Sequence, residues 1–189
     1  MSVIEGIAAL LGAIAVWLVV KRNIWNFPIG IVMVSLYAYI FWEARLYSDM
    51  GLQVVYILLQ AQGWYLWSKS DHQENEKIKV FELSREQWGI TLVVLVIGTG
   101  VIGYVMSHFT DASLPWLDAF TTSMSLTAQW WLNRQYLQSW VLWIFVDIVY
   151  LYQYSVKELY VTTALYAVFT MMAIIGYRQW KANLLNNNL

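Results

Sequence analysis

A carboxylate and several aromatic side chains share one face of a hydrophobic stretch in the second half of the chain. On a helix that turns about 100° per residue, five side chains of the stretch 139–155 fall within about 80° of one another: Trp140, Trp143, Asp147, Tyr150 and Tyr154. A charge at membrane depth is costly, and such residues usually mark a pathway or a ligand site. No Lys, Arg or His lies in the core of any hydrophobic stretch, so Asp147 has no basic partner there. This face predicts a site for an organic cation, held by charge attraction and cation–π contact together.

Two other interpretations of this face stay open. A protonated Asp147 would serve as structural glue by hydrogen bonding to a hydroxyl or amide of a neighbouring helix. Trp140 and Trp143 are two of 12 tryptophans, a residue type that is common in membrane belts and in packing positions. Their place on the face of Asp147 favours the binding site.

Uncharged polar side chains in two other hydrophobic stretches are further candidates. Gln53 and Gln60 are seven residues apart and share a face with Trp64, while Asn133 ends the stretch 117–133. Amides inside a membrane commonly join helices, and they also suit the hydroxyl and amide groups of a ligand. The candidate substrate-binding residues are therefore Trp140, Trp143, Asp147, Tyr150, Gln53, Gln60, Trp64 and Asn133.

The composition is that of an integral membrane protein. Of 189 residues, 60% are hydrophobic and 12% are charged, and the mean hydropathy is +0.51. A soluble domain has about 25% charged residues. Cysteine is absent, the only histidines (His72 and His108) lie between the hydrophobic stretches, and there is no phosphate-binding loop. We therefore expect no enzyme, no metal and no cofactor, and transport that runs downhill.

Seven hydrophobic stretches approach the roughly 20 residues that a membrane-spanning helix needs. They cover residues 4–20, 27–42, 50–67, 88–106, 117–133, 139–155 and 160–177. The polar segment 69–86 between the third and fourth is predicted to be a solvated loop, with Ser84 and Gln87 forming a capping box for the fourth helix. The first stretch lacks the flanks of a signal peptide, so we expect it to be retained.

Basic residues predict the orientation. Nine Lys and Arg residues lie in the segments on the side of the C-terminus, whereas only Arg45 and Lys157 lie on the other side. Positively charged loops stay in the cytoplasm. We therefore predict an N-terminus outside and a C-terminus in the cytoplasm.

The first three and last three stretches are similar to each other. The gap-free alignment that places Tyr37 on Tyr150 also places Gly63 on Gly176 and Trp67 on Trp180. Equivalent stretches are four spans apart and so have the same orientation, which is the parallel-repeat plan of some transporters.

The predicted fold is an all-α membrane protein with seven helices in one domain, arranged as 3+1+3 like the SWEET transporters. Repeat 1 covers about 4–67, a linker loop and helix about 68–106, and repeat 2 about 117–180. At the positions of Trp140, Trp143 and Asp147, repeat 1 has Phe27, Gly30 and Val34. Only one half therefore offers the rings and the charge.

Several motifs together resemble the Pnu vitamin transporter family over nearly the whole chain. They are Asn23-x-Trp25-Asn26-x-Pro28-x-Gly30, Leu46-Tyr47-Ser48 followed by Leu52-Gln53-Val54, Gly63-Trp64-Tyr65-x-Trp67 and, most specific, Trp140-x-x-Trp143-x-x-x-Asp147. The resemblance implies a transporter of the bacterial inner membrane, usually a homotrimer with one path per protomer. It also implies facilitated diffusion of an unphosphorylated vitamin, which a cytoplasmic kinase then traps. The lack of a buried Arg or Lys for a phosphate agrees with this.

The resemblance also bears on the substrate. Family members that carry nicotinamide riboside typically have Asn at the last motif position, and Asp147 looks like the thiamine-type (PnuT) variant. Both vitamins are permanent cations, so charge alone favours neither. We expect thiamine, with nicotinamide riboside as the alternative. A membrane receptor or assembly subunit that binds an organic cation without moving it is a second class of function.

Overall fold

Seven helices form the described part of the computed structural model, which covers residues 3–43, 47–71, 79–110, 114–156 and 160–186. They are α1 (Val3–Val20), α2 (Asn26–Glu43), α3 (Tyr47–Asp71), α4 (Arg85–Phe109), α5 (Pro115–Asn133), α6 (Ser139–Val156) and α7 (Tyr160–Asn186). Each overlaps one predicted stretch, and no strand is named within these ranges, so the all-helical prediction is confirmed. α7 runs beyond its predicted end because the helix continues past its apolar part.

Three of these helices, α1, α2 and α4, are long and apolar enough by composition alone to cross a membrane. α6 has a shorter apolar part, Ser139–Gln153. α5 falls short because it has many polar side chains, and most of these are buried. Polar residues on a helix that packs inside a bundle lower its hydropathy without exposing those residues to lipid.

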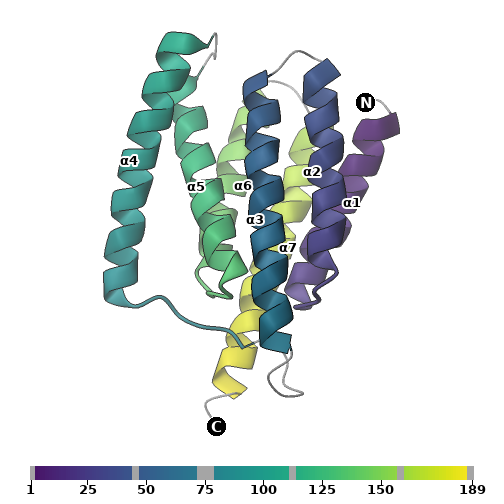
Figure 1. Cartoon of the computed structure of the whole chain (residues 1–189), viewed down its shortest axis with the longest axis vertical. Helices are drawn as coiled ribbons and strands as arrows, with labels where there is room; N and C mark the ends of the chain where they lie inside the picture. The colour runs from purple at the N-terminus through teal and green to yellow at the C-terminus, as the bar shows by residue number, and fades with distance from the viewer. Residues whose placement is uncertain (1–2, 44–46, 72–78, 111–113, 157–159, 187–189) are drawn as a thin grey trace.

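The helices form a bundle with α4 at its edge (Figure 1). α2 contacts α1 and α3, and α6 contacts α5 and α7. α1 also contacts α7 and α3 also contacts α5, while α4 packs on α5. The two chain termini lie at opposite ends of the bundle.

α4 exposes many large apolar side chains at the edge of the bundle. Val96 is 73% exposed and Val101 is 59% exposed, and similar residues surround them on several faces. Soluble monomers rarely expose so large an apolar patch. This surface is what a lipid environment requires.

Two aromatic pairs in the core have nearly the same geometry. The ring centroids of Phe27 and Trp67 are 5.0 Å apart at 89°, and those of Trp140 and Trp180 are 5.4 Å apart at 88°. The sequence alignment of the first three and last three stretches pairs Phe27 with Trp140 and Trp67 with Trp180.

In each pair the tryptophan donates a hydrogen bond to a helix that is distant in the sequence. Trp67 Nε1 on α3 donates to the carbonyl of Asn133 at the end of α5, at 3.2 Å. Trp180 Nε1 on α7 donates to the carbonyl of Val19 at the end of α1, at 3.3 Å. These bonds cap carbonyls that a helix end would otherwise leave without partners.

The turns that follow α1 and α5 share an unusual backbone conformation. Arg22 has φ 55° and Gln135 has φ 64°, the left-handed region, which ends a helix sharply. The helices that follow these turns start alike, since Asn26 and Ser139 both bond to the carbonyl three residues before them. Both turns therefore reverse the chain in the same way.

The described part of the predicted solvated loop before α4, residues 79–84, is mostly exposed, as predicted, but it is also anchored to the bundle. Val80 and Leu83 are buried, and Phe81 forms an isolated parallel bridge with Tyr136. The backbone of Phe81 accepts from Leu137 N at 2.8 Å and donates to the carbonyl of Gln135 at 2.9 Å. Residues 72–78 lie outside the described residues. The predicted capping box of Ser84 and Gln87 is confirmed.

Candidate functional site

Asp147 lies in the middle of α6 with only 6% of its surface exposed. Among the residues that the structure describes, no side chain or backbone group donates a hydrogen bond to it and no cation pairs with it. Burying a carboxylate without such partners is unfavourable. A bound cation would supply the missing charge.

Trp140 lies two turns before Asp147 on α6 and packs against α7. A Cβ on Gly176 would come within 2.7 Å of its indole ring, and the Trp180 ring meets it edge-on. The indole is 2% exposed, yet its Nε1 has no hydrogen-bond partner within the described chain. Trp140 is therefore a packing residue that also has an unused donor.

Trp143 occupies the position between these two residues. It is half-buried and packs against both hydrophobic clusters of the protein, the one around Trp140 and the one that contains Met124 and Val146. Its ring is thus less enclosed than that of Trp140 and lies one turn from Asp147. Of the two tryptophans, Trp143 is the better placed to offer a ring face to a ligand.

Tyr150 lies one turn beyond Asp147 and joins α6 to α5. Its hydroxyl interacts with the hydroxyls of Thr121 and Ser125, and its ring packs on Tyr166 of α7 with centroids 4.9 Å apart. Tyr56 of α3 also reaches Ser125. Three helices therefore bring hydroxyl groups together beside Asp147. The side chain of Tyr154, predicted on the same face, lies outside the described residues.

One face of α5 carries a row of polar residues. Asp118, Thr121, Ser125 and Gln129 repeat at intervals of three or four and so line one side of the helix. Ser125 Oγ donates to the carbonyl of Thr121 at 2.7 Å, and the Thr121 hydroxyl bonds to the preceding turn in the same way. With their protons engaged by the backbone, these oxygens act as acceptors toward the bundle interior, which suits a cation.

Asn133, a predicted site residue, is fully buried between α5 and α3. Its Nδ2 donates to the carbonyl of Leu59 at 2.7 Å, and its Oδ1 accepts from Gln129 at 2.9 Å. Gly63 allows this approach, since a Cβ there would lie 2.5 Å from Asn133 Oδ1. Both ends of the amide are therefore used by the protein in this conformation.

The other predicted residues of α3 lie in different surroundings. Gln60 points at Gly30 of α2, where a Cβ would come within 2.7 Å of its Nε2, and its buried Oε1 has no partner among the described residues. Gln53 is half-buried. Trp64 is 42% exposed, so it does not enter the core beside Gln60.

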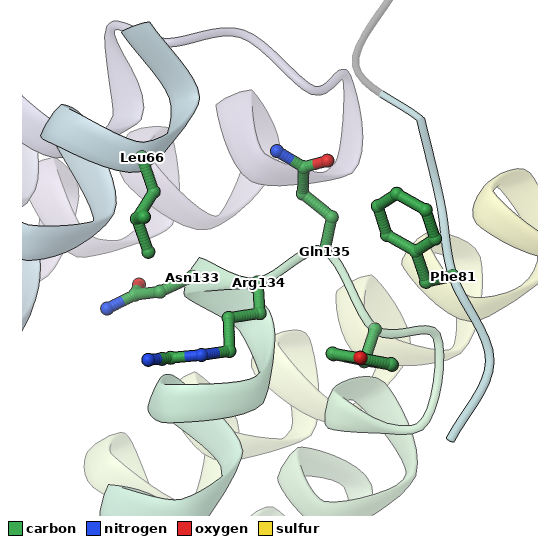
Figure 2. A pocket seen from close by; sticks show the side chains of 6 residues that line it. Leu66, Phe81, Asn133, Arg134 and Gln135 are labelled. Carbon is green, nitrogen blue, oxygen red and sulfur yellow. The ribbon is translucent and has the colours of Figure 1, made fainter. Parts of the chain in front are cut away.

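A cavity of about 300 Å³ opens at the end of α5 farthest from Asp118 (Figure 2). It is lined by Leu66, Phe81, Asn133, Arg134, Gln135 and Tyr136. Asp147 does not line it. Asn133 belongs both to this cavity and to the polar end of α5, so the cavity lies where the polar face of α5 ends.

Three residues that the structure places near Asp147 were not predicted from the sequence: Thr121, Ser125 and Tyr56. The spacing of Thr121 and Ser125 could have identified them. Together with Gln129 they form an i, i+4, i+8 polar stripe on a largely apolar stretch. Tyr56 had no such signal among 13 tyrosines.

Among the described residues there is no group of three or more His, Cys, Asp or Glu side chains that would hold a metal.

Comparison with known proteins gives the family. The family model described as nicotinamide mononucleotide transporter matches residues 2–182. The nicotinamide riboside transporter PnuC of Neisseria mucosa is 30% identical over 95% of this chain and 72% of its own length, and PnuC of Escherichia coli is 23% identical over 95% and 85%.

A solved structure agrees with these sequence matches. The crystal structure of the vitamin B3 transporter PnuC superimposes with a TM-score of 0.80 at 28% identity, covering 97% of this chain and 82% of that one. The resemblance to the Pnu vitamin transporters is thereby confirmed. The chain belongs to the nicotinamide mononucleotide transporter (PnuC) family, a family of transport proteins and not of enzymes, and is a multi-pass protein of the bacterial inner membrane.

Proposed function

We propose that this protein lets an unphosphorylated cationic vitamin diffuse across the inner membrane through a path that passes Asp147. One observation carries the proposal: Asp147 is buried beside aromatic rings and hydroxyl oxygens and has no partner in the described chain. A permanent organic cation would complete this site by charge attraction and ring contact. Transport would follow the gradient of the vitamin, as the family resemblance implies.

Nicotinamide riboside is the first candidate substrate. The named relatives are nicotinamide riboside transporters, which supports this alternative better than the thiamine we expected from the sequence. Thiamine stays the second candidate because Asp147 stands where the resemblance implies Asn for riboside carriers. Among the buried side chains of the described residues, Asp147 is the only charged one. A phosphate would need Arg or Lys there, which favours the riboside over the mononucleotide.

The path would lie between two parallel repeats, α1–α3 and α5–α7, with α4 as the linker. Three features that recur in both halves support this plan: the Phe27–Trp67 and Trp140–Trp180 ring pairs, the left-handed turns, and the Trp Nε1 bonds to helix ends. The paired contacts of α1 with α7 and of α3 with α5 fit a two-fold axis. With the C-terminus in the cytoplasm, the cavity beside Asn133 would face inward.

The remaining elements of the proposal rest on the family resemblance. A homotrimer would contain three such paths. A cytoplasmic vitamin kinase would keep the gradient inward by phosphorylating the vitamin, since a phosphate finds no basic partner among the buried side chains of the described residues.

Uptake into sealed proteoliposomes without an ion gradient tests the proposal. We expect labelled nicotinamide riboside to equilibrate across the membrane, and unlabelled riboside but not the mononucleotide to compete. Faster uptake of thiamine than of the riboside would reverse the order of the two candidates. Tight binding without flux would instead show a receptor or assembly subunit, and unchanged uptake by Asp147→Ala would remove Asp147 from the path.

A further inference from the structure

A second carboxylate lies toward the outer end of the path proposed above. Asp118 is in the first turn of α5 and is partly exposed. Its Oδ1 accepts a hydrogen bond from Nε2 of Gln153, a buried residue of α6, at 3.2 Å. Gln153 lies six residues after Asp147, about 9 Å farther along the helix at 1.5 Å per residue.

Tyr150 is within electrostatic range of both carboxylates, Asp118 and Asp147. Its hydroxyl interacts with the hydroxyls of Thr121 and Ser125. Asp147, Tyr150 and Gln153 follow one another at intervals of three on α6 and therefore form a slowly turning strip. This strip lies between the partly exposed Asp118 and the buried Asp147, which has no partner among the described residues. The hydroxyl oxygens of Thr121 and Ser125 lie beside it.

The first half of the chain has an acid, Glu5, that can be compared with Asp118. Glu5 occupies the first turn of α1, at the position that the repeat alignment pairs with Asp118, and it lies near Tyr37 as Asp118 lies near Tyr150. Both acids stabilise the N-terminal turn of their helix, because a negative charge there interacts favourably with the helix dipole. On the α2 side, however, Val34 stands at the position of Asp147. Only the acid of α5 has a second acid farther along its strip.

We propose that Asp118, positioned by Gln153, is a second cation-binding residue that receives the vitamin at the outer end of the path and passes it to Asp147. This rests on the proposed function. Its partial exposure lets Asp118 attract a cation from solution, while Tyr150 and the α5 hydroxyls give the cation acceptor oxygens between the two acids. Such a residue speeds both entry and exit, because it stabilises the state between solution and the inner site.

Stopped-flow quenching of tryptophan fluorescence by nicotinamide riboside, and by thiamine in parallel, tests this role. We expect Asp118→Asn to slow association about fivefold and dissociation by a similar factor, leaving the dissociation constant within about twofold. The difference from wild type should shrink from low to high salt, since partly exposed charges are screened. Asp118→Ser removes the same charge with a smaller side chain, so it repeats the test if the amide lowers stability.

Glu5→Gln is the matched control, because it removes an acid from the same turn of the equivalent helix. We expect its rates to stay within about twofold of wild type. Equal slowing by Glu5→Gln would reduce the effect to general surface charge, and wild-type rates in both Asp118 variants would overturn the proposal while leaving the transport function intact. Wild-type protein that binds neither vitamin would instead overturn the proposed function and this inference with it.

Discussion

Trp140 packs directly onto Gly176, so closely that a Cβ on the glycine would come within 2.7 Å of the indole ring. The contact joins α6 to α7 beside the Trp180 ring. It fixes the helix that carries Asp147 against its neighbour. The position of Asp147 therefore depends on the absence of a side chain at Gly176.

Gly176→Ala tests how much this contact contributes to the stability of the protein. The added methyl group has to displace a large, enclosed ring, which costs about 1–3 kcal/mol of unfolding free energy. We expect a lower apparent Tm for the purified protein in detergent. Gly100→Ala is the control, because a Cβ there meets nothing within 4 Å. Equal Tm values for both variants would mean that the Trp140 contact is loose.

Trp140→Phe separates the packing role of Trp140 from its donor role. Phe27 makes the equivalent contact with Trp67, so a phenylalanine is compatible with this kind of pair. The change also removes the Nε1 donor that has no partner in the described chain. We expect a smaller loss of Tm than in Gly176→Ala, and an affinity for the vitamin about 3–10-fold weaker from one lost hydrogen bond. An unchanged affinity would make Trp140 a packing residue only.

The helices were predictable from the sequence. Which side chains of different helices meet in the candidate site was much less predictable. Long apolar runs require spanning helices, so the seven elements followed from hydropathy. Hydropathy does not say how far each helix is rotated about its axis. The meeting of Tyr56, Ser125 and Tyr150 depends on that rotation, and no pattern in the sequence determined it.

The repeat contained information about Trp140 that its residue type hides. The alignment of the two halves places Trp140 on Phe27 and Gly176 on Gly63, and both aromatic residues pack on their glycine. A site residue that matches an ordinary packing residue in the other half is expected to pack as well. Asp147 has no such counterpart, since Val34 is apolar. Differences between the halves therefore point to function more directly than residue type does.

Asn133→Asp tests whether Asn133 joins helices in the way that the structure shows. A carboxylate cannot donate to the Leu59 carbonyl, which now accepts from Asn133 Nδ2 at 2.7 Å. The change removes this bond and places a charge at a fully buried position, so we expect a loss of about 1–3 kcal/mol in stability. Thermal unfolding followed by tryptophan fluorescence measures this. Wild-type stability with weakened vitamin binding would instead assign Asn133 to the ligand.

The charge of Asp147 is best tested with two ligands that differ in charge and little else. Nicotinamide riboside is a pyridinium cation, and its dihydropyridine form, reduced by one hydride, is neutral. For wild type we expect about 10-fold or tighter binding of the cation, the preference that about 1.4 kcal/mol of charge attraction gives. Asp147→Asn keeps the shape of the side chain and removes its charge.

Equilibrium binding of both ligands to both proteins, measured by fluorescence quenching at one salt concentration, is the decisive measurement. We expect the preference for the cation to fall to about twofold or less in Asp147→Asn, through weaker binding of the cation and unchanged binding of the neutral form. An equal preference in wild type and Asp147→Asn would contradict the central claim that Asp147 selects the cation.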